Sequence, residues 1–254
     1  FALAAALAYA KALTASGVGM EDAFAAVVLG LAADGDPLIS VAKLRAARLA
    51  WARLTGACGS EAPATIEARS SRRMLTKADP WTKMVRLTAA GFAAAVGGAD
   101  AIVLGTFTDA LGLPTAFARR TARNTQLILM EEGHLGAVSD PVAGSGAFEV
   151  LSADIARGAW ERFTAIETAG GLVAALRDGL IAGEARASRA VLKAALADGG
   201  LRLVGVTDFI APETRPAAVE PPPTSLAIPP DTRLPGPDSQ CPPLTPVSLE
   251  DLAR

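Results

Sequence analysis

Three charged residues are placed where an α/β protein could use them for chemistry: Glu67, Arg69 and Asp109. Glu67 and Arg69 are two positions apart on a predicted strand over residues 64–69, so their side chains share one face of a sheet. Asp109 lies in the loop that follows the next predicted strand, over residues 101–105. Charged side chains on a buried strand face are costly unless they are paired. The spacing therefore indicates either a salt bridge that fills the end of the sheet, which we favour, or groups that contact a ligand.

The other candidates for catalysis carry weaker signals. Gly144, Ser145 and Gly146 resemble a phosphate-binding loop, but they lack the spacing of a nucleotide-binding motif. We interpret them as a tight turn. His134 is the only histidine, so a serine–histidine–aspartate triad would have to use it. Its position after a predicted helix end is more typical of a capping or surface residue. We assign no catalytic residue to this chain.

The composition excludes several classes of protein. The 254 residues carry 24 basic and 26 acidic side chains, so the net charge of −2 gives no reason to expect binding to nucleic acid or to an anionic membrane. The mean hydropathy is +0.33, but no apolar run reaches the roughly 18 residues of a membrane-spanning helix. One histidine and two distant cysteines, Cys58 and Cys241, argue against a metal site and against a disulfide framework. We expect a reduced, cytoplasmic setting.

The elements that must position these residues alternate along the chain. Helices are predicted over residues 1–16, 20–33, 37–54, 79–96, 114–132, 152–168, 171–182 and 184–197. Strands are predicted over residues 64–69, 101–105, 148–150 and 201–206. Helices between short strands favour an α/β protein with parallel strands. Four strands are too few to close an eight-stranded barrel, so the pattern fits either a small open sheet or the later part of a barrel whose first strands lie upstream.

The basic residues of the helix over 37–54 and the C-terminal region have simpler interpretations. Lys43, Arg45, Arg48 and Arg53 are interpreted as a solvated helix face, because such side chains are usually exposed. Prolines cluster from Pro212 onward, which predicts an extended linker or tail. The chain begins with Phe1 inside a predicted helix, which we interpret as a truncated start.

Several long motifs together resemble the methylmalonyl-CoA mutase family. They are Arg69–Thr76, Asp79–Trp81, Phe92–Ala101, Ala110–Pro114, Ala118–Leu127, Asp140–Ser145 and Gly205–Phe209. The resemblance covers about residues 1–210 and implies a (β/α)8 TIM-type barrel, followed by a linker and a flavodoxin-like cobalamin domain. On this basis we expect a helix-rich α/β chain in three parts. These are the second half of the barrel (1–210), a Pro-rich linker (211–247) and the start of a truncated C-terminal segment (248–254).

The departures from the family pattern lie at the three residues named first. Catalytic subunits of this family carry a histidine and a glutamine that face the corrin and the substrate, and the matching positions here are Glu67 and Arg69. The matching position of a catalytic-subunit glutamate is Asp109. The cobalamin-binding motif Asp-x-His-x-x-Gly does not occur in these 254 residues. This pattern resembles the small (beta) subunit of heterodimeric bacterial mutases, which keeps the fold, lacks cobalamin and pairs with a catalytic large (alpha) subunit.

The resemblance implies an isomerase complex in which this chain is an accessory partner. Its large (alpha) subunit would interconvert methylmalonyl-CoA and succinyl-CoA with adenosylcobalamin, and neither cofactor binding nor catalysis is expected of this chain alone. Two alternatives stay open at this stage. The intact protein could itself be a catalytic acyl-CoA mutase whose cobalamin is bound by a segment not in this chain. It could also be a free-standing protein-interaction module that uses its helices and proline-rich tail.

Overall fold

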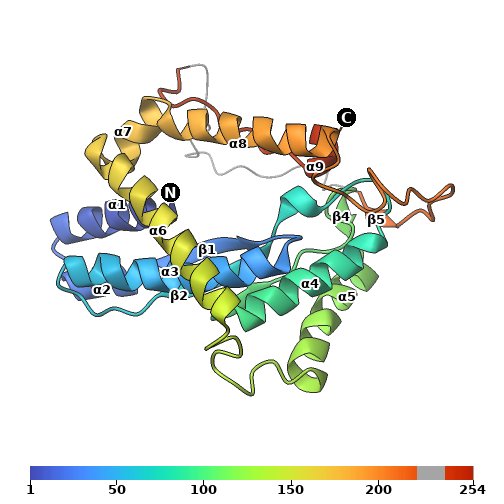
Figure 1. The fold of residues 1–254 in the computed structure, drawn as a ribbon, viewed down its shortest axis with the longest axis horizontal. Helices are drawn as coiled ribbons and strands as arrows, with labels where there is room; N and C mark the ends of the chain where they lie inside the picture. The colour runs from blue at the N-terminus through green and yellow to red at the C-terminus, as the bar shows by residue number, and fades with distance from the viewer. Residues whose placement is uncertain (222–237, 254) are drawn as a thin grey trace.

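A three-stranded parallel sheet lies at the centre of the computed structural model, which describes residues 1–221 and 238–253 (Figure 1). The strands are β1 (Val28–Ala33), β2 (Thr65–Ser70) and β3 (Ala101–Val103), in the order β1-β2-β3. In the register, Val28 pairs with Thr65 and Glu67 pairs with Ala101. The predicted α/β class with parallel strands is confirmed, and the described residues form an open sheet in which β2 is central.

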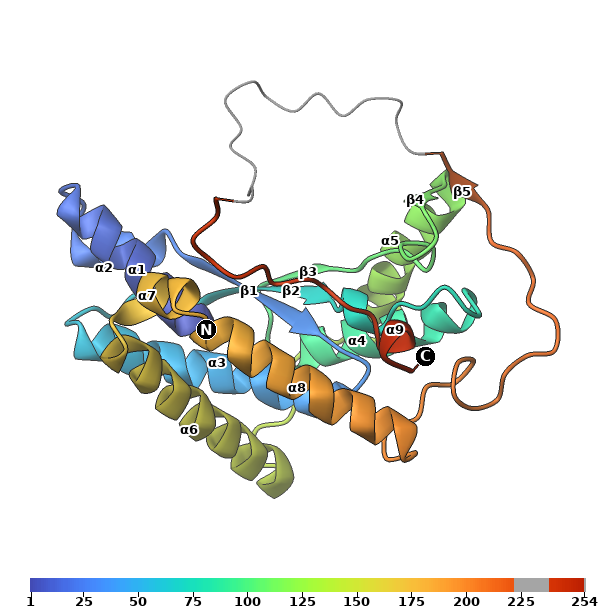
Figure 2. The same ribbon diagram turned by 90° about the horizontal axis from the view of Figure 1, so that it is seen from above.

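The helices that connect the strands cover one face of the sheet. α3 (Pro37–Ala57) links β1 to β2, α4 (Thr82–Val96) links β2 to β3, and both pack against the strands. α6 (Gly146–Thr168) forms a further layer on α3, and Figure 2 shows α6, α3 and the sheet in that order. The opposite face of the sheet is free of these helices.

Local signals explain where the main helices begin. Asp36 caps α3, because its carboxylate accepts a 3.0 Å hydrogen bond from the Ile39 amide and Pro37 occupies the first turn. Thr115 caps α5 (Ala116–Leu127) in the same way, through the amide of Ala118. α5 continues into a short π-helix, η2 (Ile128–Glu132).

The core is built from alanines around a few large side chains. Trp51 is 1% exposed, meets Phe24 edge-on at 5.6 Å between ring centroids, and donates its indole hydrogen bond to the Ala62 carbonyl at 2.9 Å. Helix α4 approaches α3 so closely that a Cβ on Gly97 would lie 2.8 Å from a methyl carbon of Leu44. Small residues at such crossings allow close packing despite the low aromatic content.

The remaining elements flank this body. They are α1 (Ala2–Ala15), α2 (Met20–Ala25), the 3₁₀ turn η1 (Arg72–Met74), α7 (Gly171–Arg177), α8 (Leu180–Ala197), α9 (Leu249–Ala253), and the antiparallel pair β4 (Leu113–Pro114) and β5 (Val219–Glu220). α8 runs across the top of the view in Figure 1, with α9 against its end. Among the described helices, none has both the length and the apolar character needed to cross a bilayer.

Three of the predicted elements were wrong. The predicted helix over 20–33 ends at Ala25 as α2, and β1 follows, because the run Val27-Val28-Leu29 favours a strand. Residues 148–150 lie inside α6 rather than in a strand. Residues 201–206 form no ladder and contribute only a single bridge, between Val204 and Asp208.

The C-terminal predictions are covered in part. The helix start predicted at 248–254 corresponds to α9, which is described from Leu249 to Ala253. The predicted linker over 211–247 includes residues 222–237, which lie outside the described residues.

Candidate functional site

The strand β2 presents Glu67 and Arg69 on the sheet face opposite to α4. Burial alternates along β2, and Ile66 and Ala68 point toward α4 while Glu67 and Arg69 point the other way. The Arg69 guanidinium forms an ion pair with the Glu67 carboxylate, and the two side chains are 67% and 28% exposed. Alternation along a strand therefore brings these two charges together on one surface, as their spacing indicates.

The third predicted site residue, Asp109, lies at the carboxyl end of the sheet. Its carboxylate accepts a hydrogen bond from the Thr106 hydroxyl in the turn after β3. A Cβ on Gly105 would lie 2.4 Å from its Oδ2 atom, so the absence of a side chain at position 105 makes room for it. The ion pairs of the described residues join Asp109 to neither Glu67 nor Arg69. The structure brings two of the three predicted residues together and places the third in a separate turn.

A small cavity of about 250 Å³ lies beside Asp109. Its walls include Arg72 and Lys77 from the segment after β2, and Glu250 from α9. The segment after β2 and the C-terminal helix are thus neighbours at the carboxyl end of the sheet, where α/β proteins commonly place their sites.

Lys83, in the first turn of α4, was missed by the sequence reasoning. It is fully buried, and its Nζ atom has no hydrogen-bond partner within the part of the chain that the structure describes. Burial lowers the pKa of Lys83 to about 8, and the negative charge of Glu250 opposes that shift. A signal was available, because Lys83 shares the helical spacing of the buried residues Leu87 and Ala90.

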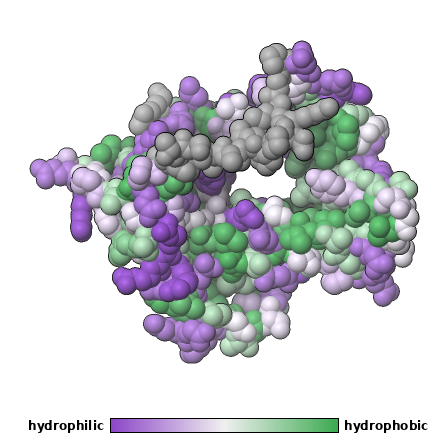
Figure 3. Space-filling model, turned by 180° about the vertical axis from the view of Figure 1, so that it is seen from behind, coloured by the Kyte–Doolittle hydropathy of each residue, from purple (hydrophilic) through white to green (hydrophobic). Residues whose placement is uncertain are grey.

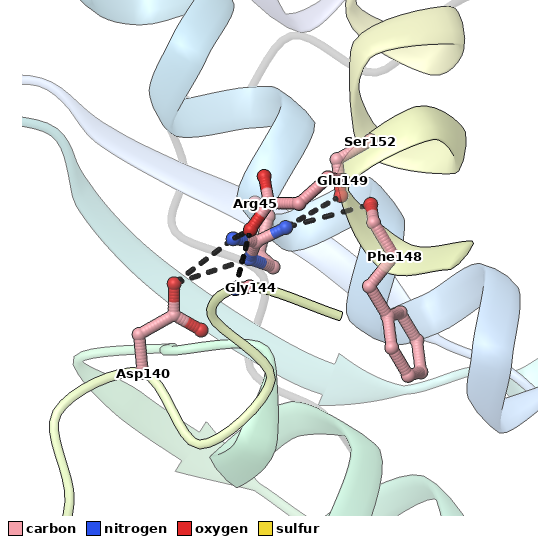
Figure 4. A network of polar contacts seen from close by, with 6 residues as sticks. All are labelled: Arg45, Asp140, Gly144, Phe148, Glu149 and Ser152. Atoms are coloured by element: carbon pink, nitrogen blue, oxygen red, sulfur yellow. Dashed lines mark hydrogen bonds and ion pairs between the residues drawn. The ribbon is translucent and has the colours of Figure 1, made fainter. Parts of the chain in front are cut away.

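A polar network around Arg45 joins α3 to the start of α6 (Figure 4). The Arg45 guanidinium lies 3.0 Å from Asp140 and 2.7 Å from Glu149, and it also donates to the Phe148 carbonyl and the Ser152 hydroxyl. The hydrogen bonds that Arg45 donates to the carboxylates of Glu149 and Asp140 raise the pKa of Arg45, and they in turn lower the pKa of Glu149. The Asp140 turn is thereby fixed against the helix layer.

The predicted solvated face on α3 holds for the exposed Arg53 but is wrong for Arg45. Arg45 is only 15% exposed, and Arg48 donates to the Ala64 carbonyl at 2.9 Å and pairs with Asp100 at 2.8 Å. Arg53 lies over the Trp160 ring at 4.1 Å. These basic side chains tie α3 to neighbouring segments, which explains why so many occur on one helix.

The weaker candidates, His134 and Gly144, both lie in turns. His134 is exposed in a turn after η2 with a positive φ of 50°, and its carbonyl accepts the amide of Ala137 at 3.0 Å. Gly144 has a φ of 77° and donates its amide to Glu149, so the predicted turn is present at Gly144, while Gly146 is already the first residue of α6. Within residues 1–221 and 238–253, no group of three or more His, Cys, Asp or Glu side chains could hold a metal ion.

The outer edge of β1 lies in an apolar groove. A cavity of about 590 Å³ is lined by α1 and β1, and it includes Ala6, Tyr9 and Leu29. Val28 at the start of β1 is 57% exposed. Figure 3, which views the molecule from the side opposite to that in Figure 1, shows apolar and polar residues intermixed over that face. A strand edge with open backbone groups beside an apolar surface can accept another strand.

Comparison with known proteins gives one consistent group of relatives. The sequence profile of a family described as methylmalonyl-CoA mutase matches residues 1–226. The methylmalonyl-CoA mutase small subunit of Streptomyces virginiae is 44% identical over 225 residues, which are 88% of this chain and 36% of that protein. The small subunit from Propionibacterium freudenreichii subsp. shermanii is 39% identical, over 68% of this chain and 28% of its own length.

A protein named only as methylmalonyl-CoA mutase is also similar, though less so. The Escherichia coli (strain K12) protein is 35% identical over 184 residues, which are 71% of this chain and 26% of that relative. This chain spans between a quarter and about a third of the length of these three relatives.

Proposed function

This chain belongs to the methylmalonyl-CoA mutase family, and from that premise we propose that it is part of an accessory small subunit. The subunit pairs with a catalytic large (alpha) subunit, and the complex interconverts methylmalonyl-CoA and succinyl-CoA. Identity supports this choice, because relatives named as small subunits are 44% and 39% identical while the protein named only as a mutase is 35% identical.

The Glu67–Arg69 ion pair is the observation that carries the proposal. Adenosylcobalamin supplies radical chemistry in this family, and a radical reaction requires a cavity from which water and reactive side chains are excluded. A carboxylate and a guanidinium on the open face of β2 would instead bring two solvated charges to that position. The residues present therefore do not fit the cofactor, and we assign the adenosylcobalamin and the acyl-CoA of the complex to the large subunit.

We also propose that β1, β2 and β3 are consecutive strands of a (β/α)8 barrel. Helices cover one face of the sheet, and Glu67 and Arg69 on the other face would point into the barrel. The open edge of β1 beside its apolar groove suits a further strand from outside this chain. In this arrangement residues 1–210 form part of the barrel, 211–247 the linker and 248–254 the start of a following segment.

Two further points complete the proposal. Cys58 and Cys241 are both free thiols, which suits a cytoplasmic complex.

The alternative in which the intact protein is itself a catalytic mutase draws support from its likeness to the Escherichia coli protein. The same experiment separates the two.

The test is to produce the full-length protein that contains this chain, alone and together with a large subunit of the family. We expect a stable one-to-one complex, with cobalamin absorbance and turnover only when the large subunit is present. A Glu67→His, Arg69→Gln double variant serves as the matched control. It places the histidine and glutamine of catalytic subunits at these two positions without changing the rest of the strand. Stoichiometric cobalamin bound by the protein alone would overturn the accessory role and favour a catalytic mutase.

A further inference from the structure

The C-terminal helix α9 is docked at the carboxyl end of the sheet. It packs against η1, the turn that follows β2, and against the end of α8. Leu249 and Leu252 of α9 are buried with Leu196 and Leu203. Figures 1 and 2 both place α9 beside the end of α8. A helix of five residues is too short to be stable by itself, so these contacts hold it in place.

The carboxylate of Glu250 in α9 lies against backbone amides that can donate hydrogen bonds to it. Its side chain accepts hydrogen bonds from the successive backbone amides of Lys77 and Ala78, the second at 3.4 Å. Glu250 is only 5% exposed, although a buried carboxylate is costly unless donors and positive charge surround it. Two adjacent amides aimed at one oxygen atom supply part of that environment.

Lys83, at the end of the same segment, adds a positive charge that acts at longer range, since its Nζ atom makes no hydrogen bond to Glu250. Its ammonium group is fully buried and has no hydrogen-bond partner among the described residues, so nothing nearby on α4 explains its presence. Glu250 is the acidic residue with the strongest influence on it, ahead of Asp109 and Asp79. The amides and the ammonium thus belong to the same short segment, residues 77–83, and favour the same anion.

We propose that residues 77–83 form a carboxylate-binding socket and that Glu250 is its internal ligand. The segment Val247–Ala253 is then a docked strap across the carboxyl end of the sheet, held by one carboxylate as well as by its leucines. The chemical class of ligand is a carboxylate, and the occupant is this chain itself. The inference is independent of the proposed accessory role, because it concerns contacts within one chain.

Hydrogen exchange on the full chain tests the proposal residue by residue. In a Glu250→Gln variant we expect the amides of Lys77 and Ala78, and those of α9, to exchange at least tenfold faster. An exposed acidic residue, Glu213, provides the control, and Glu213→Gln should leave all these rates unchanged. Rates in Glu250→Gln within twofold of the parent protein would overturn the proposal. The Trp51 indole, buried in the main core, reports whether the variant is still folded.

Chemical rescue separates a carboxylate site from simple loss of packing. In a Glu250→Ala variant, 100 mM sodium acetate should restore protection of the Lys77 and Ala78 amides, while sodium chloride at the same ionic strength should not. Adding Lys83→Met to that variant should abolish the rescue. Equal effects of acetate and chloride, or a rescue that survives Lys83→Met, would overturn the assignment of the socket.

Discussion

Arg45 and Asp140 are 95 positions apart in the chain and meet through two hydrogen bonds, with Nε and Nη2 of the guanidinium 3.3 and 3.0 Å from Oδ2 of the carboxylate. Glu149 holds the same guanidinium from the first turn of α6. One side chain on α3 therefore fixes both the turn before α6 and the start of α6. An ion pair held by several hydrogen bonds in this way is a stronger interaction than a simple surface ion pair.

Replacing Arg45 by Met should lower the free energy of unfolding by about 2 kcal/mol. The methionine keeps the apolar stem of the side chain but removes its hydrogen bonds, each worth roughly 1 kcal/mol to a partly exposed partner. Urea unfolding followed by circular dichroism measures the loss. Arg157→Met is the matched control, because its pair with Asp154 is exposed and spans one helical turn. The control should cost less than about 0.5 kcal/mol.

The same network predicts how stability responds to acid. Hydrogen bonding from Arg45 lowers the pKa of Glu149 below its usual 4.5, so this carboxylate stabilises the fold above that pH. The contribution is lost as the pH falls through the folded pKa. The difference in melting temperature between the parent protein and Glu149→Gln should therefore be constant from pH 7 to pH 5 and should shrink below pH 4.5. A difference that grows on acidification would contradict this assignment.

Local sequence signals predicted most of the helices and the strands β2 and β3, but not the long-range contacts between the elements. The cap at Asp36 and the strand over 64–69 were recognisable, because each depends on a few neighbouring residues. β1 was missed because its apolar run continues directly from α2, and an alanine-rich region does not show where helical periodicity stops. The partners of Arg45 lie about a hundred positions away, and nothing near Arg45 marks it as a buried contact rather than a solvated charge.

In the candidate site, too, local features could be predicted from the sequence and long-range contacts could not. Alternation along a strand was enough to place Glu67 and Arg69 on one face. The position of Asp109 relative to them depends on the turn after β3, which its residue types alone do not determine. The pairing of Glu250 with the segment at Lys77 joins positions 173 apart, and only the fold brings them together.

The Glu67–Arg69 pair should contribute little to the stability of this chain alone. The Arg69 side chain is 67% exposed, so Glu67→Gln should cost less than about 1 kcal/mol in urea unfolding. If the pair is enclosed in a complete barrel, the same change leaves an unpaired buried guanidinium and should cost roughly 3 kcal/mol or more. The comparison is between this chain and the full-length protein. Equal small costs in both would contradict the proposed barrel interior.

The last prediction concerns Lys83 and alkaline pH. Burial lowers the pKa of Lys83 from 10.5 to about 8 in the folded protein, with Glu250, Asp109 and Asp79 opposing the shift and Arg86 adding to it. Between pH 8 and pH 10.5 the unfolded chain binds more protons at this lysine than the folded one. The contribution of Lys83 to the free energy of unfolding must therefore rise as the pH increases through that window. The rise is at most roughly 3 kcal/mol.

Lys83→Met isolates this effect from the other groups that titrate at alkaline pH. The variant should be more stable than the parent protein at pH 7, since it removes the cost of a buried charge, and the advantage should diminish as the pH rises from 8 to 10.5. Urea unfolding at half-unit steps of pH, with the exposed Lys193 changed to Met as the control, measures the difference. A stability difference that does not change with pH would mean that Lys83 keeps its ordinary pKa in the folded state. Removing Glu250 should extend the window to lower pH, because the carboxylate that favours the charged lysine is lost.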